Sequence, residues 1–190
     1  MKRLIGTITA LIAAALFLLA IIFFKNVGPK ILDGLDGKET VSSPADPECV
    51  LHGPYKVAYV VDGDTAVINI NGAEARVRFI GVDTPESVNP DESKNVPEGK
   101  VASDFTKALL TDKSVYLEYD VDKTDDYGRT LAYVYLDNGS TMVQTRLLAA
   151  GMATTMTIQP NSKYAAMFYS TMYEARESKQ GFWATGFFTD

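Results

Sequence analysis

The sequence predicts an α+β domain built on a five-stranded β-barrel of OB type with about three helices, preceded by an N-terminal transmembrane helix. Three observations support this class. Short alternating apolar runs follow one another closely from residue 54 onward, and Asn71-Gly72 separates two of them. Helical periodicity begins only after these runs. Strands first and helices inserted late are typical of small α+β barrels.

The chain begins with an apolar segment. A lysine and an arginine precede the uncharged run Leu4–Phe24, and a lysine closes it. A helix of this length spans about 30 Å, the thickness of a hydrocarbon core, so we expect residues 1–25 to form a membrane anchor. A cleaved signal peptide is the competing interpretation. The small-residue site that it needs, Ala13-Ala14-Ala15, falls in the middle of the run, which favours the anchor.

Residues 26–50 are predicted to be a flexible linker. They are rich in glycine, proline, serine and aspartate and show no sustained periodicity.

The charges that flank the apolar run favour, by a small margin, an N-terminus inside the cell. We therefore expect a single-pass protein of the cell membrane with an extracellular domain, or a secreted protein if the segment is removed.

The domain proper is predicted to span residues 51–190. Its first strands are the runs 55–61 and 65–70, and a third strand follows the Asn71-Gly72 turn. Asn-Gly is a strong hairpin signal because both residues tolerate a positive φ. Two further strands are predicted at 114–121 and 130–136.

Three segments show helical spacing. Residues 98–112 place Val101, Phe105, Ala108 and Leu109 on one face, and residues 141–151 form a short helix that ends at Gly151. A third helix follows Pro160 and ends at Gly181. The core face predicted for it contains four large residues: Tyr164, Met167, Phe168 and Met172.

Composition excludes several classes of function. The net charge of −6 argues against a polybasic surface for nucleic acid or membrane. The chain has one cysteine, Cys49, and one histidine, His52, so an intrachain disulfide is impossible. Zinc chemistry and a Ser-His-Asp triad have almost no residues to use.

Three polar motifs fall at the ends of predicted strands. They are Asp-Gly-Asp-Thr at 62–65, an arginine strand that leads into Asp-Thr-Pro-Glu at 83–86, and Tyr-Gly-Arg at 127–129. Each motif alone is compatible with a solvated turn. Their order and spacing, together with Gly-Phe-Trp near the C-terminus, are far more specific.

Together these motifs resemble the staphylococcal nuclease (thermonuclease) family over roughly residues 54–185. The resemblance implies a calcium-dependent nuclease that hydrolyses phosphodiester bonds of DNA and RNA, acts within chains and leaves 3′-phosphates. Single-stranded or locally opened regions are the expected substrates, and no protein partner is expected. The resemblance also implies the following roles: calcium ligands Asp64, Asp83 and Thr84 (the last through its carbonyl), catalytic residues Arg78, Glu86 and Arg129, and a substrate contact at Tyr127.

Elementary electrostatics agrees with these roles. Phosphodiester cleavage builds negative charge on phosphate oxygens, which cations must meet. Three carboxylates contribute −3, while one calcium ion and two arginines contribute +4, so the loaded site is positive within an acidic protein. Calcium accepts carboxylate, carbonyl and water oxygens. Attraction for the substrate is therefore expected to be local and to depend on the metal.

Four positions lie outside the family pattern. Asp126 replaces a lysine before Tyr-Gly-Arg and would repel a phosphate. Met156 and Ile158 replace tyrosines that contact base and sugar, and such side chains stack less well on a base. Arg76 has no family role, and a solvated strand residue is its simplest interpretation.

Two functions from other classes remain open on the sequence alone. One is a non-catalytic OB-type module that binds nucleic acid or protein at the membrane. The other is a structural surface protein. The complete set of five charged residues favours the nuclease over both: Asp64, Arg78, Asp83, Glu86 and Arg129.

Overall fold

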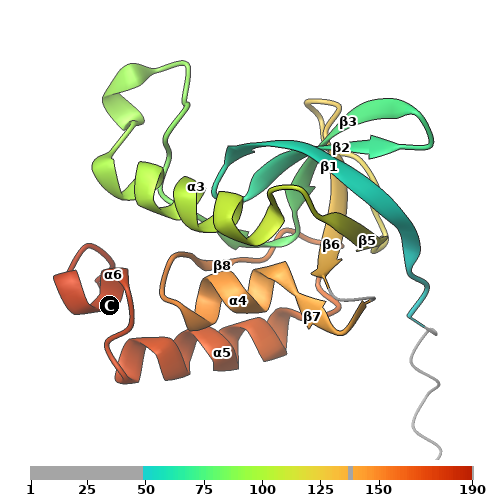
Figure 1. Cartoon of the computed structure of the whole chain (residues 1–190). Coiled ribbons are helices and arrows are strands. Elements are labelled where there is room, and N and C mark those ends of the chain that lie inside the picture. The colour runs from blue at the N-terminus through green and yellow to red at the C-terminus, as the bar shows by residue number, and fades with distance from the viewer. Residues whose placement is uncertain (1–48, 137–138, 190) are drawn as a thin grey trace, which may run out of the picture. The chain divides into compact units, whose positions relative to one another are not determined.

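The computed structural model describes residues 49–136 and 139–189 (Figure 1). The predicted anchor and almost all of the predicted linker lie outside these residues. Within the described ranges, no helix is both long enough and apolar enough to cross a membrane. The two N-terminal segments therefore stay predictions.

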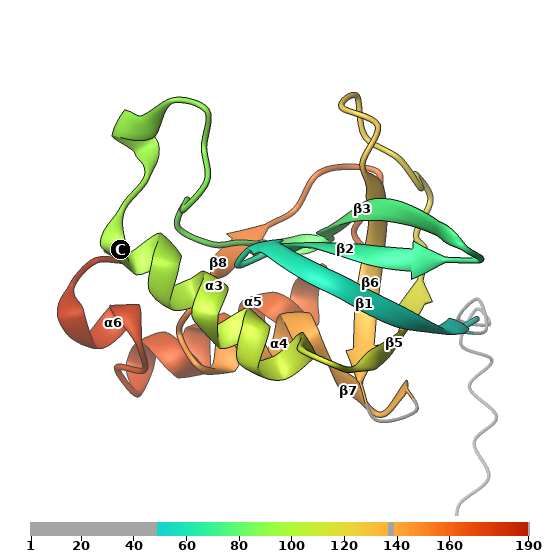
Figure 2. The same cartoon turned by 45° about the horizontal axis from the view of Figure 1, so that its top comes forward.

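Five strands close into the predicted barrel. Their order is β3-β2-β1-β5-β6, and a parallel pairing of β3 with β6 closes the ring (Figures 1 and 2). The remaining neighbours are antiparallel. The bounds are β1 His52–Asp62, β2 Thr65–Ile70, β3 Ala73–Phe79, β5 Ser114–Glu118 and β6 Thr130–Leu136. The prediction of a small closed barrel is confirmed.

Three short strands lie beside the barrel. Strand β7, Thr141–Met142, pairs with β6. Strands β4, Gly81–Asp83, and β8, Thr154–Met156, form a separate antiparallel pair. Strand β4 follows β3 almost directly, and its last residue, Asp83, is the first residue of the Asp-Thr-Pro-Glu motif.

The hairpin between β2 and β3 forms as predicted. Asn71 has φ 53° and Gly72 has φ 90°, which is the backbone that a two-residue turn of this type requires. The alternation that follows directs Val77 and Phe79 into the core, where they are almost fully buried. Arg76 and Arg78 consequently lie on the opposite face of β3.

Helices cover one side of the barrel. The longest, α3 (Pro97–Leu110), runs along β1, and α4 (Val143–Ala149) and α5 (Ala165–Glu177) pack below it (Figure 1). Two short helices complete the described chain: η1, Glu92–Lys94, and α6, Phe182–Thr185.

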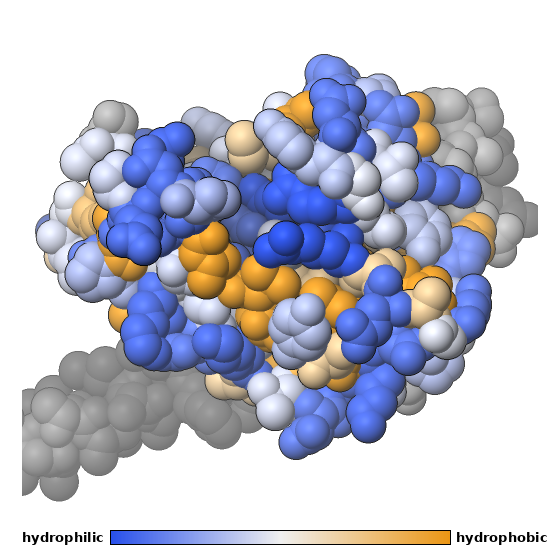
Figure 3. Space-filling model, turned by 90° about the horizontal axis from the view of Figure 1, so that it is seen from above, coloured by the Kyte–Doolittle hydropathy of each residue, from blue (hydrophilic) through white to orange (hydrophobic). Residues whose placement is uncertain are grey.

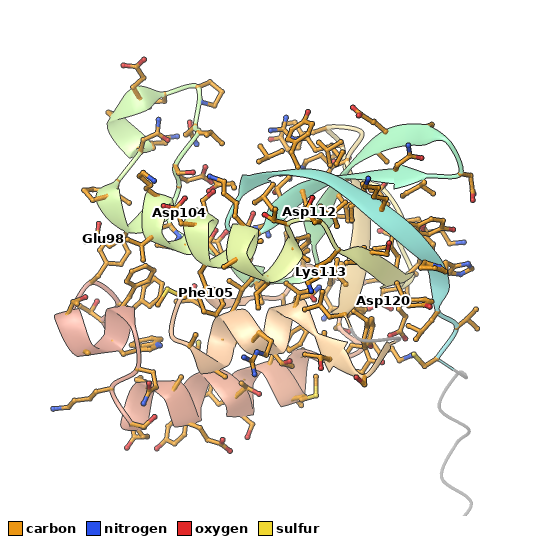
Figure 4. The ribbon with its side chains drawn as sticks, in the orientation of Figure 1. Glu98, Asp104, Phe105, Asp112, Lys113 and Asp120 are labelled. Carbon is orange, nitrogen blue, oxygen red and sulfur yellow. The ribbon has the colours of Figure 1, made fainter. Side chains whose placement is uncertain are left out.

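The buried face of α3 differs from the prediction. Val101 and Ala108 are exposed, and the residues that face the barrel are mostly small: Gly99, Ala102, Ser103, Thr106 and Leu110. A side chain at Gly99 would place its Cβ 2.0 Å from the carbonyl oxygen of Glu86. Close packing of the helix on a loop therefore selects small residues over the larger apolar ones. Phe105 still packs against the core, as predicted; it points toward the lower helices (Figure 4).

The C-terminal helix is shorter than predicted. It begins at Ala165 and ends at Glu177, and Gly181 precedes α6 instead of ending α5. Phe168 is buried as expected, but Met167 is exposed because it lies on the outer side of α5. Gly151, with φ 65°, does follow the end of α4 as predicted.

Candidate active site

Two loops meet at one end of the barrel. The turn between β1 and β2 packs against the loop after β4 so closely that a Cβ at Gly63 would lie 2.6 Å from Oγ1 of Thr84. Helix α3 supports the same turn, because Thr106 Oγ1 donates a hydrogen bond of 2.6 Å to the carbonyl oxygen of Gly63. The barrel and α3 thus fix both loops in one position.

Asp64 lies at the centre of this junction and is buried. Its Oδ2 accepts hydrogen bonds of 3.0 Å from both the backbone N–H and the hydroxyl of Thr84. Its Oδ1 accepts a hydrogen bond of 3.0 Å from the hydroxyl of Thr65. The carboxylate therefore joins the β1–β2 turn to the loop after β4.

Arg78 reaches this junction from β3. Its Nη1 lies 3.2 Å from Oδ2 of Asp64 and donates to the carbonyl of Val82 at 2.7 Å. Its Nη2 donates to Oδ1 of Asp83 at 2.9 Å and lies 3.8 Å from the sulfur of Met156. The Arg78 side chain is only 13% exposed, so one guanidinium is held rigidly between two carboxylates.

Glu86 is exposed at the mouth of the junction. The next residue, Ser87, donates a hydrogen bond of 2.7 Å from its hydroxyl to Oδ1 of Asp62. Its N–H donates to Oδ2 of Asp62 at 3.3 Å. The backbone carbonyl of Glu86 accepts from the N–H of Val96 at 3.0 Å. The loop is thus anchored on both sides of Glu86, while its side chain is exposed to solvent.

The carboxylates of the junction repel one another. Burial raises the pKa of Asp83, and Asp64 raises it further, although Arg78 acts in the opposite direction. Partial burial also raises the pKa of Glu86, with contributions from Asp62 and Asp64, while a hydrogen bond with Asn89 acts in the opposite direction. Negative charge is therefore concentrated here, and a bound cation would relieve the repulsion.

Arg129 and Tyr127 lie on a different loop, which leads into β6. Arg129 Nε donates a hydrogen bond of 2.7 Å to Asp125, whose other oxygen accepts from the N–H of Arg129 at 2.9 Å. The guanidinium carbon lies 5.5 Å from the centre of the Tyr127 ring, which is 86% exposed. Asp125 and the Tyr127 ring therefore orient Arg129.

The structure brings four of the seven predicted residues into direct contact: Asp64, Arg78, Asp83 and Thr84. Glu86 lies on the same loop as Asp83 and Thr84. The loop with Arg129 and Tyr127 approaches through the barrel closure, where Thr130 pairs with Val77 next to Arg78. Across the described ranges, no hydrogen bond or ion pair joins Arg129 to Arg78 or Glu86.

The face of the molecule that lies uppermost in Figure 1 is hollowed. A recess in its middle has a strongly hydrophilic surface and is bordered by hydrophobic side chains (Figure 3). Such a shape suits a ligand with a charged backbone and flat apolar rings.

The donor set fits a hard cation. Two carboxylates and a main-chain carbonyl supply only oxygen, which calcium prefers, and leave positions for water and a phosphate oxygen. Residues 49–136 and 139–189 contain no group of three or more His, Cys, Asp or Glu side chains arranged to hold a metal ion. A site with two carboxylates falls below that number, so the fit rests on the chemistry of Asp64, Asp83 and Thr84.

Sequence reasoning missed three residues that support the site: Asp62, Ser87 and Asp125. Asp62 appeared to be a turn residue, but it is buried and holds Ser87. Asp125 holds Arg129. Asp125 lies four residues before Arg129, across a turn, and this spacing could have indicated the ion pair. The contact of Asp62 with Ser87 spans 25 positions, and no local sequence pattern indicates it.

A closed barrel whose rim carries an arginine between two carboxylates suits the hydrolysis of phosphodiester bonds. Comparison with known proteins gives the family. Residues 76–185 match the model of staphylococcal nuclease homologues, and the chain belongs to that family. It is a nuclease, a hydrolase that cleaves nucleic acids.

Three relatives illustrate the match. A thermonuclease of Staphylococcus hyicus is 38% identical over 184 residues, which cover 97% of this chain and 99% of the relative. A thermonuclease of Staphylococcus intermedius is 45% identical over 129 residues, covering 68% and 75% of the two chains. Endonuclease YncB of Bacillus subtilis is 39% identical over 133 residues, covering 68% and 62%. These relatives favour an enzyme over the binding module and the structural protein.

Proposed function

We propose that this nuclease is a calcium-dependent endonuclease that cleaves both DNA and RNA and leaves 3′-phosphates. One observation carries the proposal: the guanidinium of Arg78 lies within 3.2 Å of both Asp64 and Asp83, where the β1–β2 turn meets the loop after β4. A phosphate that reaches this junction meets an arginine and the oxygen ligands of a hard cation at the same place.

The residues divide the work as follows. Arg78 and Arg129 bind the non-bridging oxygens of the scissile phosphate and stabilise the charge that develops on them. Glu86 orients a water molecule and accepts its proton, and its raised pKa suits this role as a base. Asp64, Asp83 and the carbonyl of Thr84 would hold calcium, which supplies positive charge against the phosphate when bound.

The surroundings of the site favour single-stranded or opened substrates. Tyr127 is largely exposed beside Arg129 and can contact a neighbouring phosphate. Met156 and Ile158 are 42% and 64% exposed, so they can pack on a base without aromatic stacking. Asp126 is also exposed, and it would weaken the binding of a terminal phosphate.

A location at the cell surface is part of the proposal. The uncharged run Leu4–Phe24 is long enough to cross a bilayer, and the charges around it favour an extracellular domain. Protease added to sealed cells should then remove the domain while the apolar segment stays with the membrane. A secreted product that lacks the run would contradict the anchor.

Digestion of plasmid DNA and of RNA tests the chemistry. The full-length chain is incubated with calcium, with magnesium or with chelator, and the ends of the products are determined. We expect cleavage of both substrates with calcium, little with magnesium, which demands stricter geometry, and none with chelator. Equal cleavage in chelator would contradict the metal roles of Asp64 and Asp83.

A further inference from the structure

A shallow groove runs along the outer face of the barrel next to the candidate active site. Five residues from β1, β2 and β3 line it: Tyr59, Val61, Val67, Glu74 and Arg76. Its volume is about 320 Å³. None of these residues belongs to the predicted catalytic set, and the family pattern gave Arg76 no role.

The ladder of strand pairs places this groove directly beside the site. Arg78 pairs with Thr65, and Thr65 pairs with Asp62. These three residues form the row of the sheet at the candidate active site. The next row on the same face consists of Arg76, Val67 and Tyr59. The two rows are two residues apart along β3, or about 6.7 Å.

Arg76 is suited to hold an anion. It is exposed, and in residues 49–136 and 139–189 no carboxylate lies within ion-pair distance of its guanidinium, whereas Arg78 and Arg129 both have such partners. Glu74 lies two residues further from Arg78 on the same face. Positive charge is therefore confined to the end of the groove that is nearest to Arg78.

Tyr59 supplies an apolar surface opposite Arg76. Its side chain is 56% exposed although it lies within a β-strand and beside the buried Val67. Tyr59 also lines a second hollow of about 560 Å³ on the same part of the barrel. An exposed tyrosine on a strand of an OB-type barrel can stack on a nucleic-acid base.

We propose that this groove is a subsite for a nucleotide that flanks the scissile phosphate, with Arg76 on its phosphate and Tyr59 against its base. The 6.7 Å offset along β3 is comparable with the spacing of successive phosphates in an extended single strand, so one strand can reach Arg78 and Arg76 together. The proposal rests on the proposed nuclease function and assigns the groove to the substrate, in continuity with the active site.

Two substrates separate this subsite from the catalytic site. One is a short single-stranded oligodeoxynucleotide that can extend into the groove. The other is a minimal diester, a nucleoside joined through phosphate to nitrophenol, that reaches the catalytic residues alone. Arg76→Gln and Tyr59→Ala in the full-length chain should each raise KM for the oligonucleotide by about fivefold or more, at little change in kcat. The ratio of kcat/KM between the two substrates should fall by the same factor.

Salt dependence and a matched pair provide the controls. Arg76→Gln should reduce the slope of log KM against log salt by roughly 0.7, the effect of one lost phosphate contact on a single strand. On α5, far from the groove, Arg176 also lies over a tyrosine, Tyr173 (Figure 1). Arg176→Gln and Tyr173→Ala should leave the oligonucleotide KM and the salt slope unchanged.

The outcomes distinguish the two proposals. If the unaltered protein cleaves neither substrate, the proposed function fails and the subsite fails with it. If it cleaves both, but Arg76→Gln and Tyr59→Ala keep the KM of the unaltered protein, the subsite is wrong and the nuclease stands. Equal losses on both substrates would also overturn the subsite, because they would indicate a role in the catalytic centre itself.

Discussion

Arg78 carries the largest share of the proposed chemistry at the scale of single residues. A surface ion pair contributes only about 0–1 kcal/mol, so an ordinary arginine in this place would be replaceable. Arg78 instead donates to carbonyls and carboxylates from both of its terminal nitrogens. Its planar fork therefore has a fixed direction, which an ammonium group cannot reproduce.

We expect Arg78→Lys to reduce the rate of calcium-dependent DNA cleavage by about 10³-fold. Arg129→Ala should cause a loss of similar size, because both groups meet developing phosphate charge. Single-turnover rates measure the effect, and thermal unfolding shows whether the variants fold. Arg146→Lys, an exchange at the end of α4, serves as the control and should keep the full rate. Folded Arg78→Lys and Arg129→Ala variants within about tenfold of the unaltered protein would contradict the assignment.

Ser87 is expected to act through Glu86. Removing its hydroxyl in Ser87→Ala breaks the 2.7 Å bond to Asp62 and leaves the longer bond from its N–H. The loop should then hold Glu86 less firmly, and kcat should fall by about tenfold, or about 1.4 kcal/mol in the barrier. Ser87→Thr, which keeps the hydroxyl, should restore most of the rate.

Ser93 offers a matched comparison for this test. It lies in the same connection between β4 and α3, and its hydroxyl also donates to an aspartate, Asp91, but at an exposed position away from the site. Ser93→Ala should leave kcat unchanged. If Ser87→Ala and Ser93→Ala behave alike, the hydrogen bond to Asp62 does not position Glu86.

At the scale of elements, α3 packs closely on the loop that carries Glu86. Replacing a helical glycine by alanine usually stabilises a helix by up to about 1 kcal/mol. Gly99→Ala should do the opposite, because the new Cβ would lie 2.0 Å from the carbonyl oxygen of Glu86. We expect a lower melting temperature and a lower rate of cleavage.

Thermal unfolding and the cleavage rate of Gly99→Ala measure this junction. Val101→Ala, at an exposed position of the same helix, is the control and should change neither quantity by much. A Gly99→Ala variant that is more stable than the unaltered protein and equally active would show that α3 does not fix the loop.

Prediction from sequence succeeded where local patterns determine the structure, and it failed in part at this junction. Alternation and the Asn-Gly turn determine a strand locally, so β2 and β6 were predicted with their observed bounds. The buried face of α3 was predicted only in part: Phe105 and Leu109 pack against the core, but the rest of the face depends on how closely a distant loop approaches. Apolar spacing pointed to Val101 and Ala108, whereas close packing selects Gly99 and Ala102.

The candidate site divides in the same way. Its charged residues form short motifs at strand ends, which made them predictable. The hydrogen bonds that hold these residues in place join distant parts of the sequence. Asp62 contacts Ser87 across 25 positions, and Asp64 contacts Thr84 across 20. No local pattern encodes such contacts, since they exist only once the barrel has closed.

At the scale of the whole molecule, a partly buried ion pair joins the barrel to the segment that leads into α5. Lys163 forms an ion pair with Glu118, which also accepts hydrogen bonds from Tyr135 and Tyr164. Burial alone would raise the pKa of Glu118, but these hydrogen bonds together hold it below the ordinary value of 4.5. The hydrogen bond to Glu118 raises the pKa of Lys163 above 10.5.

These shifts define the pH range in which the pair stabilises the fold. The lowered pKa of Glu118 gives stability that is present above pH 4.5 and lost as the pH falls through the pKa of the folded state. The raised pKa of Lys163 gives stability that is present below pH 10.5 and lost as the pH rises through its folded pKa. The ion pair should therefore contribute its full stabilisation of the fold between pH 4.5 and pH 10.5.

We expect Glu118→Gln to lower the free energy of unfolding at neutral pH by about 2 kcal/mol. This is less than the roughly 3–5 kcal/mol of a fully buried pair, because Lys163 keeps some exposure to solvent. Denaturant unfolding from pH 3 to 8 measures the effect, and the variant should lose less stability than the unaltered protein on acidification. Glu177→Gln, at an exposed ion pair on α5, should change little. If Glu118→Gln lost as much stability on acidification as the unaltered protein, Glu118 would not be the source of this pH dependence.

We propose that one rim of the barrel binds calcium through Asp64 and Asp83 and activates water through Glu86. The most direct test of this proposal measures calcium-dependent DNA cleavage together with the calcium-induced rise in melting temperature for Glu86→Gln and Asp64→Asn. We predict that Glu86→Gln loses at least about 10²-fold in rate yet is still stabilised by calcium, and that Asp64→Asn loses both the rate and the stabilisation. A folded Glu86→Gln variant that cleaves DNA within about tenfold of the unaltered protein would contradict the claim.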